Sequence, residues 1–134
     1  IAIEPYMDTP YVNLADIYRS QQKPAQVASV LKKGMAKIPN SPLLKYSYGL
    51  FLIRHKKLEK AVEYFEQAMK LVPTEPQYAY TYVLAVDAQG NSQLALRKLR
   101  TLIGNYANKA QLNDLGLYLA QKLQDRDAYN QFSQ

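Results

Sequence analysis

Residues 41–74 read SPLLKYSYGLFLIRHKKLEKAVEYFEQAMKLVPT, and this stretch decides the fold class. Its apolar residues recur every three or four positions on both sides of a short charged turn, as one face of a helix requires. Ser41 followed by proline is typical of a helix N-cap with proline in the first turn, and Pro73 closes the segment. The small residues Gly49 and Ala61 predict a close approach of the two helices. The stretch therefore predicts a hairpin of two amphipathic helices.

The rest of the chain contains imperfect copies of this pattern. The interval from Ala15 to Gly49 equals the interval from Gly49 to Val83. A further step, shorter by a single position, leads from Val83 to Gly116, so four copies fit, the last cut short at the C-terminus. A fixed period of this length is typical of solenoids, in which each hairpin is stabilised by stacking on its neighbours.

We therefore expect an N-terminal extension at residues 1–7 and one helical-repeat domain at 8–134, with repeats at about 8–41, 42–75, 76–108 and 109–134. No segment alternates with a period of two for long enough to argue a strand, so the predicted fold is all-α. The expected helices span 8–21, 24–37, 42–55, 58–71, 76–89, 92–105, 109–122 and 125–133. Gly90 is expected to end its helix in the left-handed conformation.

These repeats resemble the tetratricopeptide repeat (TPR) family. The second copy carries the family pattern at Tyr48, Gly49, Leu52, Ala61, Phe65, Ala68 and Pro73. The other copies match it less fully, at Leu14, Ala15, Tyr18, Leu31 and Pro39, then Gly90, Ala95 and Leu99, then Gly116, Ala128 and Phe132. The resemblance implies a right-handed α-α superhelix of about four repeats whose first helices line a concave groove. In this family the groove binds an extended peptide or a helix of a partner protein.

A narrower resemblance concerns residues 78–90, YAYTYVLAVDAQG, which look like TPR modules of bacterial multihaem cytochrome-like proteins. No CxxCH haem motif occurs in the sequence. This resemblance favours the bacterial periplasm over the cytoplasm, and the residues themselves leave the compartment open.

Helical phase places three columns of residues from the first helices on the groove. The columns are Val12, Tyr46, Tyr80 and Asn113; Asp16, Leu50, Leu84 and Leu117; and Arg19, Ile53, Asp87 and Ala120. Beside them runs a polar ladder of Asn13, Ser47, Thr81 and Asp114. Because tyrosine combines a large contact area with a polar tip, we interpret the apolar columns as a site for an apolar or aromatic partner segment. The alternative is that these side chains fill a tight superhelix or contact an adjoining segment of the same protein.

Other partners are less favoured by the sequence. The lysine, asparagine and arginine residues with which some TPR modules clamp a terminal carboxylate are absent from the matching positions. Net charge is +6, but the two basic clusters, at 54–57 and 97–100, are separate, so we interpret them as a solvated rim and expect no nucleic-acid binding. Five tyrosines are expected in the repeat core: Tyr11, Tyr18, Tyr48, Tyr82 and Tyr118. We also expect no insertion into a membrane, because no apolar run is long enough.

Catalysis has little support in the sequence. The chain has no cysteine and a single histidine, His55, on a predicted exposed turn, and its five glycines do not form a phosphate-binding loop. We therefore predict no enzyme, no metal site and no cofactor. Two functions stay open: a scaffold that binds a protein or peptide partner in the groove, and an assembly module. The second would oligomerise, or dock onto the rest of a larger parent protein, through an apolar end left exposed near Phe132.

Overall fold

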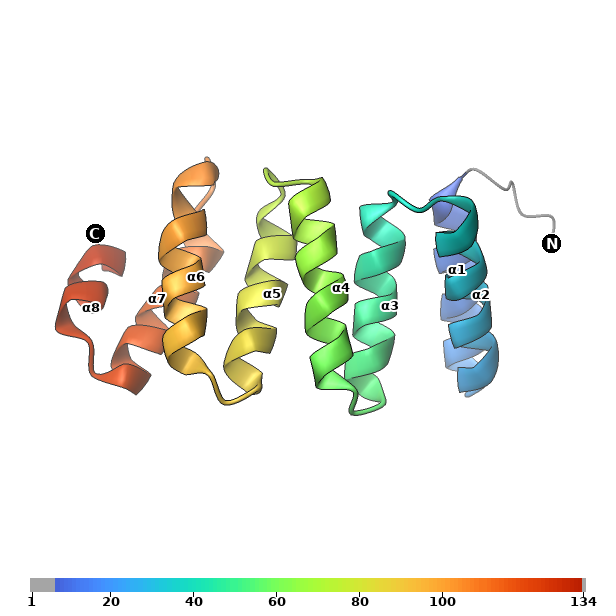
Figure 1. Ribbon diagram of the computed structural model, residues 1–134, viewed down its shortest axis with the longest axis horizontal. Helices are drawn as coiled ribbons and strands as arrows, with labels where there is room; N and C mark the ends of the chain where they lie inside the picture. Colours follow the sequence, from blue (N-terminus) through green and yellow to red (C-terminus); the bar gives the residue numbers. More distant parts are fainter. Residues whose placement is uncertain (1–6, 134) are drawn as a thin grey trace. The chain divides into compact units, whose positions relative to one another are not determined.

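Residues 7–133 are described by a computed structural model, and they form an all-α fold (Figure 1). Over this range there are eight α-helices, one short 3-10 helix and no strand. The helices are α1 (Asp8–Ser20), α2 (Pro24–Lys37), α3 (Pro42–Arg54), α4 (Leu58–Leu71), α5 (Pro76–Ala88), α6 (Ser92–Leu102), η1 (Ile103–Asn105), α7 (Ala110–Leu123) and α8 (Arg126–Phe132). The predicted helices are confirmed, each boundary within one residue, except that α6 gives way to η1 over its last turn. The extension expected at residues 1–7 lies outside the described residues, apart from Met7.

The chain divides into two compact units, Ile1–Leu71 and Val72–Gln134. Unit 1 contains the hairpins α1–α2 and α3–α4, and α3 packs against both helices of the first hairpin. Unit 2 contains the hairpins α5–α6 and α7–α8, and α7 packs against both α5 and α6. Each unit is therefore a pair of stacked hairpins, which is how a helical repeat buries a core that one hairpin cannot enclose.

Side-chain caps fix the start of three helices. The Oγ atom of Ser41 accepts a hydrogen bond from the backbone N–H of Leu44 at 3.1 Å, as predicted for the start of α3. Asn91 caps α6 and Asp125 caps α8 in the same way, through the N–H groups of Leu94 and Ala128. Each cap satisfies one of the backbone donors that the first turn of a helix leaves without an intrahelical partner.

In the hairpins α3–α4 and α7–α8 the two helices approach so closely that only glycine fits at the contact. A Cβ atom added to Gly49 on α3 would lie 2.5 Å from a ring carbon of Phe65 on α4, well inside van der Waals contact. The same notch recurs in unit 2, where a Cβ at Gly116 on α7 would lie 2.4 Å from Cγ of Phe132 on α8. Both phenylalanines are buried. The close approach predicted at Gly49 is therefore confirmed, with the ring of Phe65 as the partner.

The hairpin turns recur at a constant interval along the chain. One residue in each turn has a positive φ, and the four are evenly spaced: Gln22 (58°), Lys56 (60°), Gly90 (86°) and Gln124 (54°). The prediction for Gly90 is confirmed, whereas no local signal in the sequence marks the other three, which are not glycine. A non-glycine residue in this region costs roughly 1–2 kcal/mol, so three of the four turns are strained.

The core of the fourth copy follows the shortened step that the sequence indicates. Each buried position of α7 follows a buried position of α5 at this shorter interval: Leu112, Leu115, Gly116, Leu119 and Ala120 after Ala79, Tyr82, Val83, Val86 and Asp87. The turn, however, keeps the longer interval of the other turns. Compared with the α5–α6 hairpin, the last hairpin therefore has one more residue between the buried positions of α7 and the turn. It has one residue fewer between the turn and the buried positions of α8.

We expect Gly49→Ala and Gly116→Ala to lower the free energy of unfolding by about 1–3 kcal/mol, because the added methyl group would displace a buried ring. This loss should exceed the gain in helix propensity of about 1 kcal/mol that alanine brings. Denaturant unfolding followed by circular dichroism measures the change. Gly104→Ala is the matched control, since no described atom lies within 4 Å of its added methyl group. An unchanged stability of Gly49→Ala would contradict the close approach.

Candidate functional site

The groove residues predicted in unit 1 are only partly brought together. Val12, Ser47 and Leu50 line one small hollow of about 50 Å³ on the α1 and α3 face. Asn13 and Ile53 are exposed but do not line it, and the ring of Tyr46 packs against Phe65, with 5.7 Å between centroids. In this unit the predicted surface is thus shallow, and one of its tyrosines serves the core.

Unit 2 holds a larger hollow on the α5 and α7 face. Tyr80 and Leu84, both predicted for the groove, line it from α5, and Leu84 is 40% exposed. Its volume is about 300 Å³. We call it the tyrosine hollow, and its lining residues are Tyr80, Leu84, Gln111, Asp114, Leu115 and Tyr118. Asp114 belongs to the predicted polar ladder, whereas Thr81 does not line the hollow and accepts a hydrogen bond from the side chain of Gln77.

Tyr118 is not a core residue, contrary to the prediction from the repeat pattern. Its side chain is 47% exposed, while Tyr11, Tyr48 and Tyr82 are buried as predicted and Tyr18 is half-buried. The hydroxyl of Tyr118 donates a hydrogen bond to Oδ2 of Asp87 on α5 at 3.3 Å. The ring therefore lies toward α5, where it lines the tyrosine hollow. A polar partner on the neighbouring helix, which sequence periodicity cannot show, decides its position.

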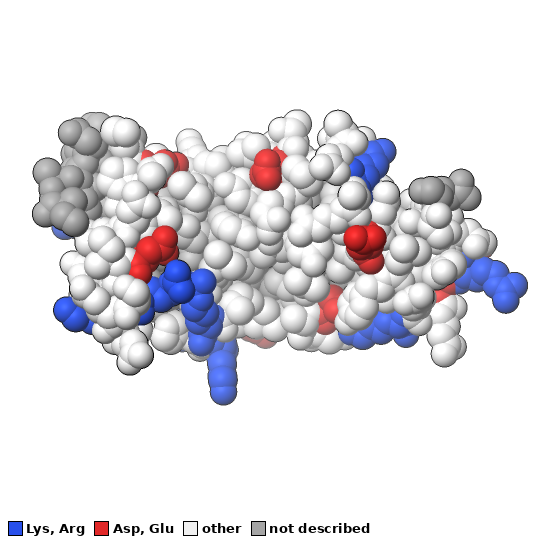
Figure 2. All heavy atoms as spheres, turned by 180° about the vertical axis from the view of Figure 1, so that it is seen from behind, with Lys and Arg blue, Asp and Glu red and all other residues white. Residues whose placement is uncertain are grey.

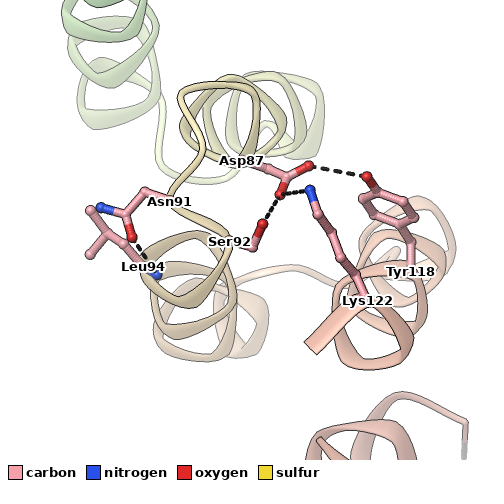
Figure 3. Close-up of polar contacts among 6 residues, drawn as sticks. All are labelled: Asp87, Asn91, Ser92, Leu94, Tyr118 and Lys122. Carbon is pink, nitrogen blue, oxygen red and sulfur yellow. Dashed lines mark hydrogen bonds and ion pairs between the residues drawn. The ribbon is translucent and has the colours of Figure 1, made fainter. Parts of the chain in front are cut away.

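Asp87 is also placed differently from the prediction, because it is buried instead of lying on the groove surface. Only 7% of the residue is exposed, and its carboxylate is held by side chains from two neighbouring helices (Figure 3). The Ser92 hydroxyl donates to Oδ1, and the Lys122 ammonium donates to the same oxygen at 2.9 Å. Together with Tyr118 these contacts tie α5 to α6 and α7. Asp87 therefore braces the wall of the tyrosine hollow, and its carboxylate is already engaged within the unit.

Electrostatics favour the charged form of this pair. Burial alone raises the pKa of the Asp87 carboxyl, but the hydrogen bonds from Ser92, Lys122 and Tyr118 and the charge of Lys122 outweigh it, so the net pKa is lowered. The pKa of the Lys122 ammonium is raised, first by its hydrogen bond to Asp87. The ammonium also lies 5.6 Å from the centroid of the Tyr118 ring, within the range of a cation–π contact.

A carboxyl whose pKa is lowered in the folded state stabilises the fold above its unfolded pKa, and this contribution disappears as the pH falls through the lowered value. We therefore expect the wild type to lose stability progressively below about pH 4. Asp87→Asn should be less stable at neutral pH by about 1–2 kcal/mol and should lose less on acidification. Thermal unfolding of both proteins across this pH range measures the difference. Asp127→Asn is the control for the loss of one negative charge, because Asp127 is exposed and makes no contact with Asp87.

Other kinds of site find no support within residues 7–133. No group of three or more His, Cys, Asp or Glu side chains in this range is placed to hold a metal ion. His55 lies on the exposed turn that was predicted, with its ring 4.4 Å from that of Phe51. The search for helices long and apolar enough to cross a bilayer gives none among the described residues.

No family model matches the chain, and no curated protein sequence matches it either. Solved structures do resemble it. A crystal structure of MamA has a TM-score of 0.77 at 16% identity and is matched over 96% of this chain and 75% of its own. YrrB, described as a TPR protein with an unusual peptide-binding site, has a TM-score of 0.71 at 19% identity. The match covers 95% of this chain and 66% of YrrB. The structure of MamA 41-end from Desulfovibrio magneticus RS-1 has a TM-score of 0.71 at 21% identity, and the match covers 93% of this chain and 71% of that one. At these identities the likeness establishes the fold alone, and that fold is the helix-hairpin repeat of TPR proteins.

Proposed function

We propose that residues 8–134 form one protein-interaction domain, a TPR scaffold that binds a partner peptide or helix along the first helices of its hairpins. The observation that carries this proposal is the tyrosine hollow. Tyr80, Leu84 and Tyr118 offer an open apolar and aromatic surface of the kind that anchors a partner side chain. A solved structure with the same fold is described as having a peptide-binding site, which supports the same class of function.

The geometry of the hollow favours an apolar or aromatic anchor. Its volume of about 300 Å³ lies at the lower end of the range for ligand sites, so it fits one or two side chains. The hydrogen bonds that Tyr118 and Lys122 donate to Asp87 hold one wall of the hollow in place before a partner binds. A surface that is already ordered loses less conformational entropy on binding. Within unit 1, the positions proposed to contact a partner are Val12, Asn13, Tyr46, Ser47, Leu50 and Ile53.

Selection of random dodecapeptides displayed on phage, followed by affinity measurement on the synthetic peptides, tests this function. Leu84→Glu should weaken the binding of a selected apolar peptide by about 10- to 100-fold. A leucine that becomes buried on binding contributes about 1.5–3 kcal/mol, and the charge of the new glutamate would be desolvated. Ile17→Glu is the matched control, since Ile17 is equally exposed on α1 but lines neither hollow described above. Equal affinities of the wild type and Leu84→Glu for every selected peptide would contradict the proposed site.

A second candidate function, assembly, has its own observation in the last hairpin. An apolar end was expected to be exposed near Phe132; Phe132 itself is buried against Gly116, but Tyr129 on α8 is 41% exposed. It borders an open hollow of about 260 Å³ that Ala120 and Gln124 also line. Through this end the chain would self-associate or dock onto other parts of a larger protein, for which the multihaem cytochrome-like resemblance suggests one type.

Sedimentation velocity over a wide concentration range tests self-association. If the last hairpin mediates it, the wild type will form dimers or larger species as the concentration rises, and Tyr129→Glu will stay monomeric. The folded state should be unaffected, because the Tyr129 side chain is exposed. A wild type that stays monomeric at every concentration removes self-association and leaves docking to another protein.

A further inference from the structure

Unit 1 has a second hollow, and Arg19 is its only lining residue that was also predicted for the groove. It lies where the turn between α1 and α2 meets the C-terminal end of α3, and its volume is about 370 Å³. Cationic side chains surround an apolar floor. We call it the basic hollow, and its main lining residues are Arg19, Lys23, Arg54 and His55, with Val27 and Phe51 as the floor. Arg54 and His55 belong to a basic cluster that was predicted to be a solvated rim. Only folding brings them next to Arg19 and Lys23 of the first hairpin.

The charges of the basic hollow are largely uncompensated. Arg19 pairs with Asp16 at 3.6 Å, but both side chains are more than half exposed, and such a pair contributes little. Lys23 and Arg54 have no ion pair with any residue in the described part of the chain. No acidic residue lines the hollow. On the face drawn in Figure 2, Lys and Arg atoms form separate groups among mostly uncharged residues.

The floor of the basic hollow would receive an apolar group beside an anion. Val27 is buried at its base, and Phe51 is half-buried, with its ring against the His55 imidazole. Two guanidinium groups at the rim suit a carboxylate, since each can donate two parallel N–H bonds to its two oxygens. A ligand that satisfies both parts of the site combines a carboxylate with an adjacent apolar side chain.

The basic hollow is continuous with the groove residues of the same unit. Arg19, Phe51 and Arg54 line it and also line the small hollow that contains Val12, Ser47 and Leu50. A peptide lying along α1 and α3 could therefore reach the cations without leaving this face. This continuity favours an acidic peptide segment over a small free anion as the occupant.

We propose that the basic hollow binds an aspartate or glutamate side chain of the partner, next to an apolar residue of the same segment. The proposal rests on the proposed function and gives it a specificity: the partner segment is acidic as well as apolar. Arg54 and Lys23 are the residues that select the acidic side chain, and Val27 and Phe51 receive its apolar neighbour.

The test uses the random dodecapeptide library on two charge-reversed proteins of equal net charge. The first, Lys23→Glu with Arg54→Glu, alters the basic hollow. The second, Lys33→Glu with Lys60→Glu, alters exposed lysines on α2 and α4 that do not line it. Circular dichroism confirms that both retain the helicity of the wild type.

Peptides selected on the wild type should be enriched in an acidic residue adjacent to an apolar one. The synthetic peptide should bind the first variant at least about tenfold more weakly, because the reversal removes charge-assisted hydrogen bonds and sets like charges against the acidic side chain. It should bind the second variant as it binds the wild type. Equal weakening in both variants would show that net charge alone attracts the peptide, and this would overturn the proposal.

Two further measurements separate the possible outcomes. If an excess of inorganic phosphate displaces the peptide from the wild type but an excess of acetate does not, the hollow is specific for phosphate and the carboxylate assignment is wrong. Leu84→Glu, measured on the same peptide, separates this proposal from the proposed function. A peptide weakened by Leu84→Glu but not by the Lys23 and Arg54 reversal would support the tyrosine hollow and refute the basic one. The converse result would support only the basic hollow.

Discussion

A contact between a glycine and a phenylalanine ring sets how closely the helices pair in one hairpin of each unit. The ring of Phe65 occupies the space that a side chain at Gly49 would need, and Phe132 does the same at Gly116. Because a ring lies directly against backbone, the two helices pair closely and leave their other faces to meet neighbouring hairpins. The packing of α3 against α4, and of α7 against α8, follows from this contact.

The first helices carry two chemically different surfaces. The tyrosine hollow in unit 2 is apolar and aromatic, and the buried charge beside it, Asp87, is neutralised by Lys122 inside the unit. The basic hollow in unit 1 has the opposite character, since Lys23 and Arg54 are left without a counterion among the described residues. The charge of Asp87 is thus paired within the fold, whereas Lys23 and Arg54 stay at the surface, where the proposed acidic partner would meet them.

Local sequence was enough to predict the helices, because proline, glycine and cap residues such as Ser41 mark their ends and apolar periodicity marks their buried faces. It also predicted Tyr80 and Leu84 as open positions on α5. It failed at Tyr118 and Asp87, where a hydrogen bond to the next hairpin overrides the periodic pattern. The basic hollow escaped prediction for a related reason: Lys23 and Arg54 belong to different hairpins, and only the stacking of the two hairpins brings them to one cavity.

The turns of the hairpins differ in how firmly they are fixed, and this bears on the motion of the surfaces beside them. The turn at Gly90 adopts its left-handed angle without strain, Asn91 caps the helix that follows, and the Ser92 hydroxyl is bonded to Asp87. The turn at Gln22 has a strained angle and leads into α2 without a side-chain cap. Fewer restraints mean a lower free energy of local opening, so backbone amides should exchange with solvent faster around Gln22 than around Gly90. We therefore expect the turn beside the tyrosine hollow to be more rigid than the turn beside the basic hollow.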